Sequence, residues 1–552
     1  MLAFQPLLKK YFPTPAAPQQ QAAQPVGSVP AAPAPPSAAT VVPAVPAVSK
    51  QASSETETVI ENDLYRITFT NRGAQVKSWI LKKFDNDAES GPLDLVNPAA
   101  APGYGYPLSL WTYDENLRGK LSSALYVSSQ EGKLTSPATL TFEYSDSDLV
   151  VWKKFTFDET YIVKIETSVT YKGSPVAALP AWPSGFGDQT TPAFYAAGLI
   201  DYQFNKNIER LAVKKISGGA TIPGPFHWAG PTDQYFAAVF IPDDPATAAM
   251  VTLRSPLSIP RDAQKDTKEH VNVDVLGAAV GNLHGATSER VFVGPKELEV
   301  LQKVSVPGVT GADSDLNGLV DFGWWGIIAK PLFIWLRWTY HHMIANWGWA
   351  IIVQTLIISV LLLPLRVTQM KSMLKMQRVQ PQIKSIQEKY KKYSLRDPRK
   401  AAMNEEISAL YKKEGVNPVG GCLPMLIQMP FLFAYYRMLG TALDLRHAHW
   451  LWVKDLSAAD PFFVLPILMV VSSLLTQRMT PQAGMDPAQQ RMMNVMMPLM
   501  MGFIFFRLAA GLNLYYAVVN VIGIAQQAVM NRTHLGREMR EMLAKRARKK
   551  DK

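Results

Sequence analysis

The sequence predicts a multi-domain protein in which an all-β sandwich precedes an α-helical membrane core of five spans that carries a cytosolic helical hairpin. Three observations predict this architecture. Short runs of alternating polar and apolar residues fill the first half of the chain, five long apolar stretches fill the last third, and Lys and Arg gather in only some of the segments between those stretches. The first pattern is typical of antiparallel strands, and the other two are typical of a multi-pass membrane protein.

The composition indicates more than one domain. The chain has 552 residues, of which 48% are hydrophobic and 18% are charged, and its net charge is +11. This length exceeds what one compact core normally holds, and this composition suits neither a disordered protein nor an ordinary soluble enzyme. Cys422 is the only cysteine, so the chain can form no internal disulfide and no cysteine-based metal cluster.

The N-terminal segments are predicted to be an anchor remnant and a linker. Residues 1–12 are largely apolar but too short to span a bilayer, so we interpret them as the remnant of a first membrane anchor. Residues 13–55 are dominated by Pro, Ala, Gln, Ser and Val, which cannot bury enough apolar surface to fold. This second segment is therefore predicted to be a semi-extended linker.

Residues 56–310 are predicted to form the sandwich. Apolar and polar residues alternate in four clear runs, at 64–70, 140–144, 150–157 and 161–167, and Gly, Asp, Asn and Pro separate such runs. This combination favours antiparallel strands joined by turns. The sequence of this region has no cluster of His, Asp and Glu with the spacing of metal ligands and no Gly-rich phosphate loop. We therefore expect a binding or spacing domain without a cofactor.

The membrane core is predicted at 345–532. Five apolar stretches there approach the roughly 20 helical residues that a bilayer requires, at 347–366, 421–440, 461–478, 492–507 and 510–530. The preceding segment, 320–342, is rich in Trp, Leu and Ile but also contains Lys330, Pro331 and Arg337. That mixture favours a helix in the membrane interface over a sixth span.

The distribution of basic residues predicts the orientation. Segments 367–420 and 533–552 are rich in Lys and Arg, whereas loop 441–460 has only Arg446 and Lys454. The two basic segments should therefore face the cytosol, and five spans then place the sandwich on the opposite side. Apolar residues at three- and four-residue spacing predict a helical hairpin at 367–420. The candidate contacts to anionic lipids or to a ribosome are Lys391, Lys392, Arg546, Arg548, Lys549 and Lys550.

Uncharged polar residues inside the spans are the candidate functional residues. Thr355 and Ser359 are four residues apart and therefore share a helix face, and Gln354 adjoins them. Gln428 and Asn520 lie in the second and fifth spans. Two interpretations are open. These residues can hold a helix bundle together by interhelical hydrogen bonds, or they can line a wet groove that accepts the polar parts of a passing chain.

Two further features concern the class of protein. The fourth span carries a run of methionines, Met492, Met493, Met496, Met497, Met500 and Met501. Their flexible side chains suit hydrophobic partners of varied shape, although simple packing explains them equally well.

The spans contain no Asp, Glu, Lys or His in their interiors, which argues against an ion-coupled transporter of small solutes. An envelope scaffold is the other competing class, in which the sandwich would carry the function.

One segment closely resembles a motif of the YidC family of membrane protein insertases, namely Asn417-Pro-Val-Gly-Gly-Cys-Leu-Pro-Met-Leu-Ile-Gln-Met-Pro430. Further matches between about 320 and 532 include Asn346-Trp-Gly348, Pro364-Leu365, Asp455-Leu-Ser457, Asp486-Pro487, Met497-Pro498 and Gly511-Leu-Asn-Leu-Tyr-Tyr516. The sandwich matches more weakly, through Asn71-Arg-Gly73, Gln234-Tyr-Phe236 and Val293-Gly-Pro295. It is similar to the periplasmic domain of the Gram-negative members.

The resemblance implies a function. A YidC-like protein of the bacterial inner membrane is an insertase and chaperone, not an enzyme, and its sandwich lies in the periplasm. It transfers hydrophobic segments of nascent proteins from the cytosol into the bilayer through a hydrophilic groove, alone or with the Sec translocon. The implied partners are nascent membrane proteins, the ribosome, the Sec translocon and anionic lipids. The resemblance implies no small-molecule substrate, no metal and no other cofactor.

The resemblance also assigns residues. Thr355, Gln428 and Tyr516 would line the groove, joining the candidates Ser359, Gln354 and Asn520. A substrate segment would slide along the second and fourth core helices, where Met429, Pro430, Met496 and Met500 lie.

The chain departs from the family at one groove position. The family usually has an arginine five residues before the Pro364-Leu365 pair, and this chain has Ser359 there. Arg366 follows seven residues later, about 10 Å farther along a helix, and is the candidate substitute for the missing charge.

Overall fold

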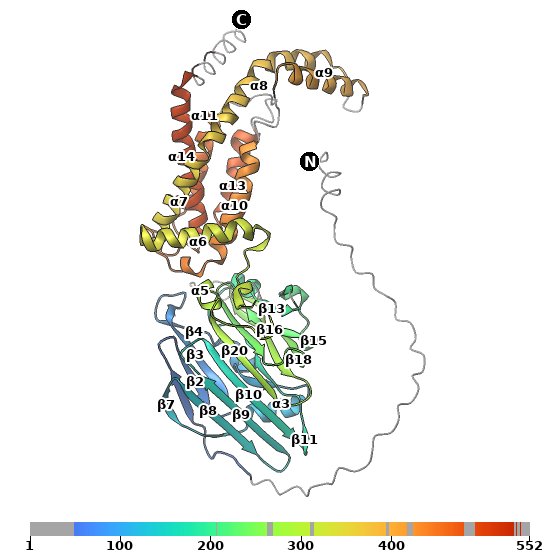
Figure 1. The fold of residues 1–552 in the computed structure, drawn as a ribbon, viewed down its shortest axis with the longest axis vertical. Coiled ribbons are helices and arrows are strands. Elements are labelled where there is room, and N and C mark those ends of the chain that lie inside the picture. The colour runs from blue at the N-terminus through green and yellow to red at the C-terminus, as the bar shows by residue number, and fades with distance from the viewer. Residues whose placement is uncertain are drawn as a thin grey trace, which may run out of the picture. The chain divides into compact units, whose positions relative to one another are not determined.

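The computed structural model describes residues 49–205, 207–261, 269–309, 314–393, 397–416, 423–479 and 492–534, together with 537 and 541. A strand-rich part is followed along the chain by a helical part (Figure 1). The anchor remnant predicted at 1–12 and nearly all of the linker predicted at 13–55 lie outside the described residues.

Three sheets make up the strand-rich part (Figure 1). The largest has the order β14 (Asn207–Ala212), β13 (Leu199–Phe204), β16 (Phe226–Thr232), β17 (Phe236–Pro242), β20 (Thr287–Pro295), β10 (Ile162–Tyr171), β9 (Leu149–Phe157), β8 (Ala138–Ser145) and β6 (Val127–Ser128), with β11 (Ser174–Pro175) beside β10. The second has the order β4 (Pro92–Asp94), β3 (Gln75–Asp85), β2 (Tyr65–Thr70), β1 (Glu57–Glu61) and β7 (Gly132–Thr135). The third has the order β15 (Ala220–Pro223), β18 (Ala248–Pro260), β19 (His270–Asn282), β12 (Leu179–Trp182) and β5 (Ser109–Trp111).

The predicted β domain is confirmed, and its strands follow the alternation of the sequence. In β9 every second residue is buried, from Leu149 and Val151 to Phe155 and Phe157. Strand β10 pairs with β9 in antiparallel register and shows the same alternation. Side chains of successive strand residues point to opposite faces, so this pattern directs one face of the sheet toward a core.

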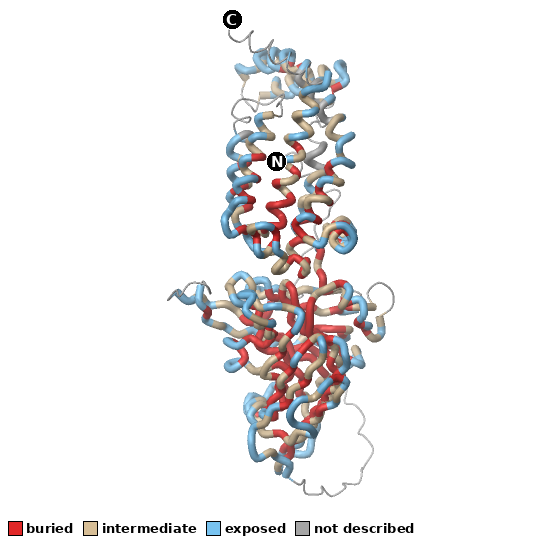
Figure 2. Tube along the Cα trace, turned by 90° about the vertical axis from the view of Figure 1, so that its left-hand side faces the viewer, coloured by how far each residue is buried: buried red, intermediate tan, exposed pale blue. Residues whose placement is uncertain are grey.

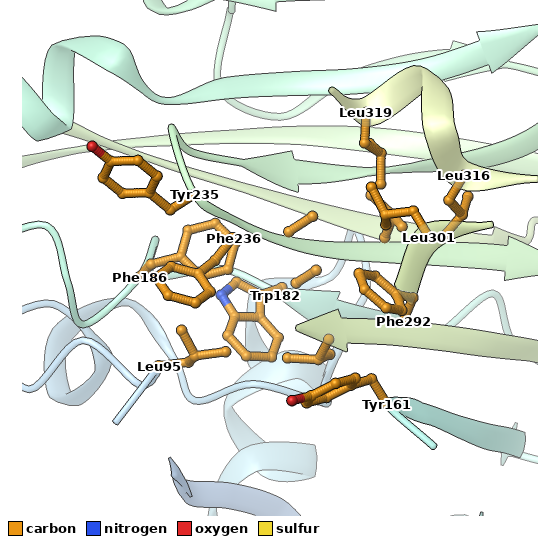
Figure 3. Packing of buried hydrophobic residues seen from close by; sticks show 14 of the residues in the cluster. Leu95, Tyr161, Trp182, Phe186, Tyr235, Phe236, Phe292, Leu301, Leu316 and Leu319 are labelled. Atoms are coloured by element: carbon orange, nitrogen blue, oxygen red, sulfur yellow. The ribbon is translucent and has the colours of Figure 1, made fainter. Parts of the chain in front are cut away.

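Aromatic side chains fill that core (Figure 3). Trp182 lies with its ring centre 5.8 Å from Trp79 and 5.5 Å from Phe186. Tyr161 approaches Phe292 edge-on at 6.4 Å. Burial of each such ring contributes about 2–3 kcal/mol, so the aromatic residues that connect the sheets account for much of the stability of this part.

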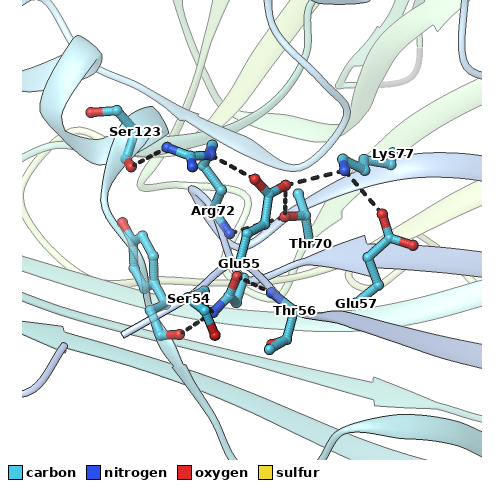
Figure 4. Close-up of polar contacts among 10 residues, drawn as sticks. Ser54, Glu55, Thr56, Glu57, Thr70, Arg72, Lys77 and Ser123 are labelled. Atoms are coloured by element: carbon cyan, nitrogen blue, oxygen red, sulfur yellow. Dashed lines mark hydrogen bonds and ion pairs between the residues drawn. The ribbon is translucent and has the colours of Figure 1, made fainter. Parts of the chain in front are cut away.

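The Asn71-Arg72-Gly73 turn fastens the start of the described chain to the sheet (Figure 4). The Asn71 side chain accepts the Thr56 N–H at 2.8 Å and donates to the Ser54 carbonyl at 2.9 Å. Arg72 Nε donates to the Glu55 carboxylate at 2.9 Å, and Lys77 Nζ lies 3.1 Å from the same group. These contacts lower the pKa of Glu55 to about 2. The weak motif seen in the sequence thus has a structural role.

Gly73 itself is required by geometry. Its φ is +70°, and a Cβ atom there would lie 2.6 Å from the Ser122 carbonyl oxygen. A residue with a side chain would therefore meet both an unfavourable backbone conformation and fixed backbone atoms.

The helical part consists mainly of α6 (Gly326–His342), α7 (Trp347–Leu361), α8 (Leu363–Lys389), α9 (Arg399–Lys413), α10 (Leu423–Thr441), α11 (Val464–Met479), a π-helical turn (Met492–Met496), α13 (Met497–Phe505) and α14 (Ala510–Arg532). Shorter helical elements occur in both parts of the described chain. Those between the strands are α2 (Ala101–Tyr104), α3 (Glu115–Ser123), α4 (Pro192–Ala197) and η1 (Val213–Lys215). Those after the last strand are α5 (Leu298–Leu301), η2 (Leu316–Leu319), η3 (Gly323–Trp325) and η5 (Leu443–Leu445).

Helices lie at all five predicted spans, but they differ in length from a typical span. Among the described residues, α14 alone is both long and apolar enough to cross a bilayer. A second span results if Gly323–His342 and α7, between which the chain bends by 120°, are counted as one segment. Helix α11 is apolar but shorter. Prolines account for part of this difference, because Pro364 and Pro498 are the second residues of α8 and α13 and interrupt the apolar segments there.

Two other predicted elements are present as helices. The segment predicted to lie in the interface contains η3 and α6, which exposes Trp324, Ile327 and Trp338 and buries Phe333 and Leu336. The predicted hairpin contains α8 and α9. Its small core includes Val379, Ile383 and Val416, with Ile407 and Leu410 packed against it.

Candidate functional site

A cavity lies among helices α7, α8, α10 and α14. It is small, because the space in it that can hold the centre of a water molecule has a volume of about 40 Å³. Its lining residues are Thr355, Ile358, Ser359, Leu362, Leu365, Arg366, Gln428, Phe431, Tyr515 and Val519. The cavity therefore combines polar groups with aliphatic and aromatic surface.

The cavity lies beside the most tightly packed ends of the helices. Buried positions gather toward the starts of α7 and α14, from Trp347 to Thr355 and from Ala510 to Tyr515, and become rarer farther along both helices (Figure 2). Helix α10 runs in the opposite sense, with Ala434, Tyr435 and Met438 buried near its end. The cavity thus begins where close packing ends.

Four of the predicted residues meet in this cavity. Thr355 and Ser359 lie on one face of α7, as their four-residue spacing predicted, and Gln428 faces them from α10. Thr355 is buried, and its hydroxyl donates to the Ile351 carbonyl at 2.6 Å.

Arg366 supplies the charge of the lining. Its guanidinium lies against α14, since a Cβ atom at Gly523 would be 3.0 Å from Nη1. The missing side chain at Gly523 gives the guanidinium this room. Among the described residues, no carboxylate lies within ion-pair distance of Arg366.

Three predicted groove residues are not among the lining residues. Gln354 donates to the Leu332 carbonyl at 2.9 Å and accepts the Tyr435 hydroxyl at 2.8 Å. Asn520 donates to the Ser473 hydroxyl at 2.8 Å and so connects α14 to α11. Tyr516 packs its ring against Phe505 with centres 5.0 Å apart. These residues make the helix–helix contacts that were the alternative interpretation of the sequence.

Several lining residues were not predicted. Tyr515, rather than its neighbour Tyr516, faces the cavity, and Val519 follows one turn later on the same face of α14. Ile358 and Leu362 continue the face of Thr355 and Ser359. The spacing of the polar pair could have identified these two apolar residues, whereas nothing in the sequence distinguished Tyr515 from Tyr516.

The proposed substrate-contacting residues lie on exposed apolar helix surface. Met429 on α10, Met496 and Met500 are exposed, and Pro430 is partly exposed. Phe433 on α10 and Phe503 on α13 are exposed as well. Large apolar side chains in such numbers would be unfavourable in water, so this surface suits contact with lipid or with a hydrophobic chain.

The proposed charged contacts are only partly described. Lys391 and Lys392 are exposed after the end of α8, whereas Arg546, Arg548, Lys549 and Lys550 lie outside the described residues. Within the described ranges, no three His, Cys, Asp or Glu side chains are grouped as metal ligands would be.

Comparisons with known proteins connect both parts of the chain to one family. A model described as the YidC periplasmic domain matches residues 57–335, and a model described as the 60Kd inner membrane protein matches residues 338–537. Of the curated relatives named membrane protein insertase YidC, the one from Geobacter sulfurreducens is 32% identical over 85% of this chain and 85% of its own length. The one from Geotalea daltonii is 30% identical over 95% of each chain.

Solved structures include one described as an active YidC insertase with its first transmembrane domain resolved. It is 20% identical, covers 88% of this chain and 96% of its own, and has a TM-score of 0.35. The sequence matches carry the assignment, because they extend over both the strand-rich and the helical part. The chain belongs to the YidC family of membrane protein insertases.

Proposed function

We propose that this chain moves hydrophobic segments of newly made proteins from the cytosol into the bacterial inner membrane, and that the cavity among α7, α8, α10 and α14 receives their polar parts. The observation that carries this proposal is the lining itself. Thr355, Ser359, Gln428 and Arg366 gather between helices whose other surfaces are largely apolar.

The physical reason is the cost of moving polar groups through hydrocarbon. An unsatisfied backbone group in the bilayer core costs several kcal/mol. A polar cavity that reaches partway across the membrane shortens that path, and partition of the hydrophobic segment into lipid provides the net driving force. The activity requires no covalent step and no cofactor.

The topology belongs to the same proposal. Five segments, at 347–366, 421–440, 461–478, 492–507 and 510–530, cross the membrane, while α6 lies in the outer interface and the β domain lies in the periplasm. The hairpin at 367–420 and the tail at 533–552 face the cytosol. The asymmetric distribution of Lys and Arg supports this orientation, and the exposed Trp324 and Trp338 support an interfacial position for α6.

Arg366 takes the place of the groove arginine that Ser359 does not provide. Its guanidinium lines the same cavity as Ser359 and packs against Gly523, which supports this assignment. A fixed positive charge there attracts acidic residues at the end of a substrate.

The substrate segment leaves the cavity along α10 and α13, past Met429, Pro430, Met496 and Met500. Unbranched thioether side chains adapt to segments of different shape. Lys391, Lys392 and the tail bases Arg546, Arg548, Lys549 and Lys550 contact the ribosome and anionic lipids. The chain acts alone or together with the Sec translocon.

Reconstitution tests this function. The purified chain is placed in protein-free liposomes, and a small membrane protein that does not require Sec is added from outside. We expect its translocated part to become protected from protease in proportion to the amount of insertase. Equal protection in liposomes without the chain, or none with it, would contradict the proposal. A Thr355→Val, Gln428→Leu double variant should lose most of the activity.

A further inference from the structure

One buried side-chain amide joins three helices at the end of the cavity. Gln354 on α7 donates through Nε2 to the Leu332 carbonyl of α6 at 2.9 Å. Its Oε1 accepts the hydroxyl of Tyr435 on α10 at 2.8 Å. Gln354 and Tyr435 are both fully buried. The amide thus links α6, the helix proposed to lie in the interface, to the interior of the bundle.

The link continues to the cavity wall. The Tyr435 ring is stacked on Tyr515 of α14, with centres 4.0 Å apart and planes inclined by 12°. Tyr515 lines the cavity, and so does Thr355, the chain neighbour of Gln354. Gln354 and Tyr435 therefore form a continuous series of contacts from α6 to a side chain at the inner end of the cavity.

Close-packed apolar side chains lie on the far side of this link. Ile351, one turn before Thr355, is fully buried, and Leu439, one turn after Tyr435, is nearly so. A Cβ atom at Gly511 would lie 3.7 Å from both of them, which shows how closely α14 approaches at this level. Gln354 and Tyr435 therefore mark the boundary between the cavity and a dry layer.

We propose that Gln354 is a positioning residue that couples α6 to the inner end of the cavity and so sets how far water enters from the cytosolic side. The proposal rests on the proposed insertase function and adds a residue that acts through Tyr435 and Tyr515. Removal of the amide leaves the Tyr435 hydroxyl and the Leu332 carbonyl without this partner in a buried layer. The layer then loosens, and the cavity deepens toward Ile351.

Cysteine reactivity measures this depth. In a chain with Cys422→Ala, single substitutions Gln428→Cys and Ile351→Cys report on the cavity and on the dry layer, because Gln428 lines the cavity and is partly exposed whereas Ile351 is fully buried. A small hydrophilic thiol reagent is added to inverted membrane vesicles. We expect the thiol at 428 to react and the thiol at 351 to remain protected. Adding Gln354→Leu should raise the rate at 351 about tenfold, which corresponds to about 1.4 kcal/mol.

Two further variants separate the coupling from general loosening. Tyr435→Phe keeps the stack on Tyr515 and the bond from Gln354 to Leu332, so it should raise the rate at 351 while hydrogen exchange of the α6 amides stays unchanged. Gln354→Leu should raise both the rate at 351 and the hydrogen exchange of the α6 amides. Gln526→Leu is the matched control, because it removes a hydrogen bond from Gln526 to the Ser359 carbonyl (3.1 Å) beside the same cavity. The rate at 351 should not change in that variant.

The proposal is wrong if the rate at 351 stays at the parental value in both Gln354→Leu and Tyr435→Phe, or if Gln526→Leu raises it as much as they do. The liposome insertion assay is read separately. Failure of the unmodified chain to insert a substrate would refute the proposed function, whereas these reactivities do not depend on added substrate.

Discussion

Arg366 lines the cavity about two helical turns beyond Ser359, so the charge of the lining lies past the end of α7, at the start of α8. Arg366→Gln keeps a similar side-chain length and removes the charge. We expect insertion of a substrate with an acidic terminus to fall about tenfold, because attraction of a carboxylate by a partly desolvated guanidinium is worth at least about 1.4 kcal/mol. Protease protection in liposomes measures this yield.

The control uses the position that the family pattern names. Ser359→Arg, introduced into the Arg366→Gln variant, should restore insertion of the acidic substrate. A substrate with an uncharged terminus should be inserted equally well by all three chains. An equal loss for acidic and uncharged substrates would show that Arg366 acts through packing against Gly523 and not through its charge.

A buried carboxyl in β20 predicts a pH dependence of stability. Glu289 is fully buried, and neither of its carboxyl oxygens has a hydrogen-bond partner among the described residues. Burial raises the pKa of Glu289 well above its usual value, so the folded chain holds this proton more tightly than the unfolded chain. The folded state therefore loses stability as the pH rises from the unfolded pKa, about 4.3, toward the raised one.

Glu289→Gln removes this dependence. We expect the variant to be more stable than the parent at pH 8 by at least about 1.4 kcal/mol, the equivalent of one pKa unit, and to differ little near pH 4. For a domain of this size such a change raises the melting temperature by about 3–5 °C. Thermal unfolding of the β domain, followed by tryptophan fluorescence in detergent, provides the measurement. An equal gain in stability at both pH values would contradict the inference that the folded chain holds Glu289 in its protonated form.

At the residue scale, the sequence predicted the helix face on which a side chain lies better than the residues that the side chain contacts. The four-residue spacing of Thr355 and Ser359 predicted a shared helix face, and both residues line the cavity. Gln354 was a groove candidate because it adjoins Thr355, and its amide joins Leu332 and Tyr435. Periodicity fixes the angle of a side chain around its own helix, whereas the neighbour that it meets depends on how the other helices pack.

At the element scale, the exposed apolar faces of α10 and α13 predict where a substrate segment lies. A photoreactive residue at Met429 or Met500 should cross-link to the hydrophobic segment of a stalled nascent chain. The same residue at Val529, which is about as exposed as Met500 but lies on α14, should capture mainly lipid. Gel analysis of radiolabelled nascent chains compares the adducts. Equal yields of the nascent-chain adduct at Val529 and Met500 would contradict a defined path for the substrate segment.

Secondary structure was predicted well where one pattern dominates a segment. The alternation at 150–157 recurs as the alternating burial of β9, because the side chains of a strand must point to opposite faces. The exception is Lys153, which occupies an inward position. Its ammonium group donates to the carbonyls of Gly73, Ala74 and Leu108 at 2.6–3.1 Å. A local sequence pattern cannot predict hydrogen-bond partners that are so far away along the chain.

The apolar stretches gave the positions of the core helices but not their ends. The first predicted span, 347–366, is divided between α7 and α8 next to Pro364, and the fourth, 492–507, begins with a π-helical turn before Pro498. Hydropathy measures the composition of a window, whereas a helix ends where a backbone hydrogen bond is lost.

At the scale of the whole molecule, the two parts of the chain have different consequences for function. The cavity residues all come from 355–366, 428–431 and 515–519, so the lining is built without the β domain. We therefore expect replacement of residues 60–300 by a short linker, behind an N-terminal membrane anchor, to retain most of the insertion activity. Complementation of insertase-depleted cells tests this expectation. Loss of growth despite normal levels of the shortened chain in the membrane would favour an envelope scaffold.

The proposed orientation of the chain rests on the uneven distribution of its basic residues and can be tested with two matched lysines. Lys391 follows α8 in the hairpin, Lys454 lies in loop 441–460, and both are exposed. In a chain with Cys422→Ala, Lys454→Cys should react with a membrane-impermeant maleimide in intact spheroplasts, whereas Lys391→Cys should react only after lysis. The positive-inside preference arises because clustered bases resist transfer across the membrane, and the hairpin has many of them where the loop has two. Tyr113→Cys, at an exposed site in the β domain, should behave like Lys454→Cys. Labelling of Lys391→Cys before lysis would place the hairpin outside, where a cavity could not receive chains from the cytosol.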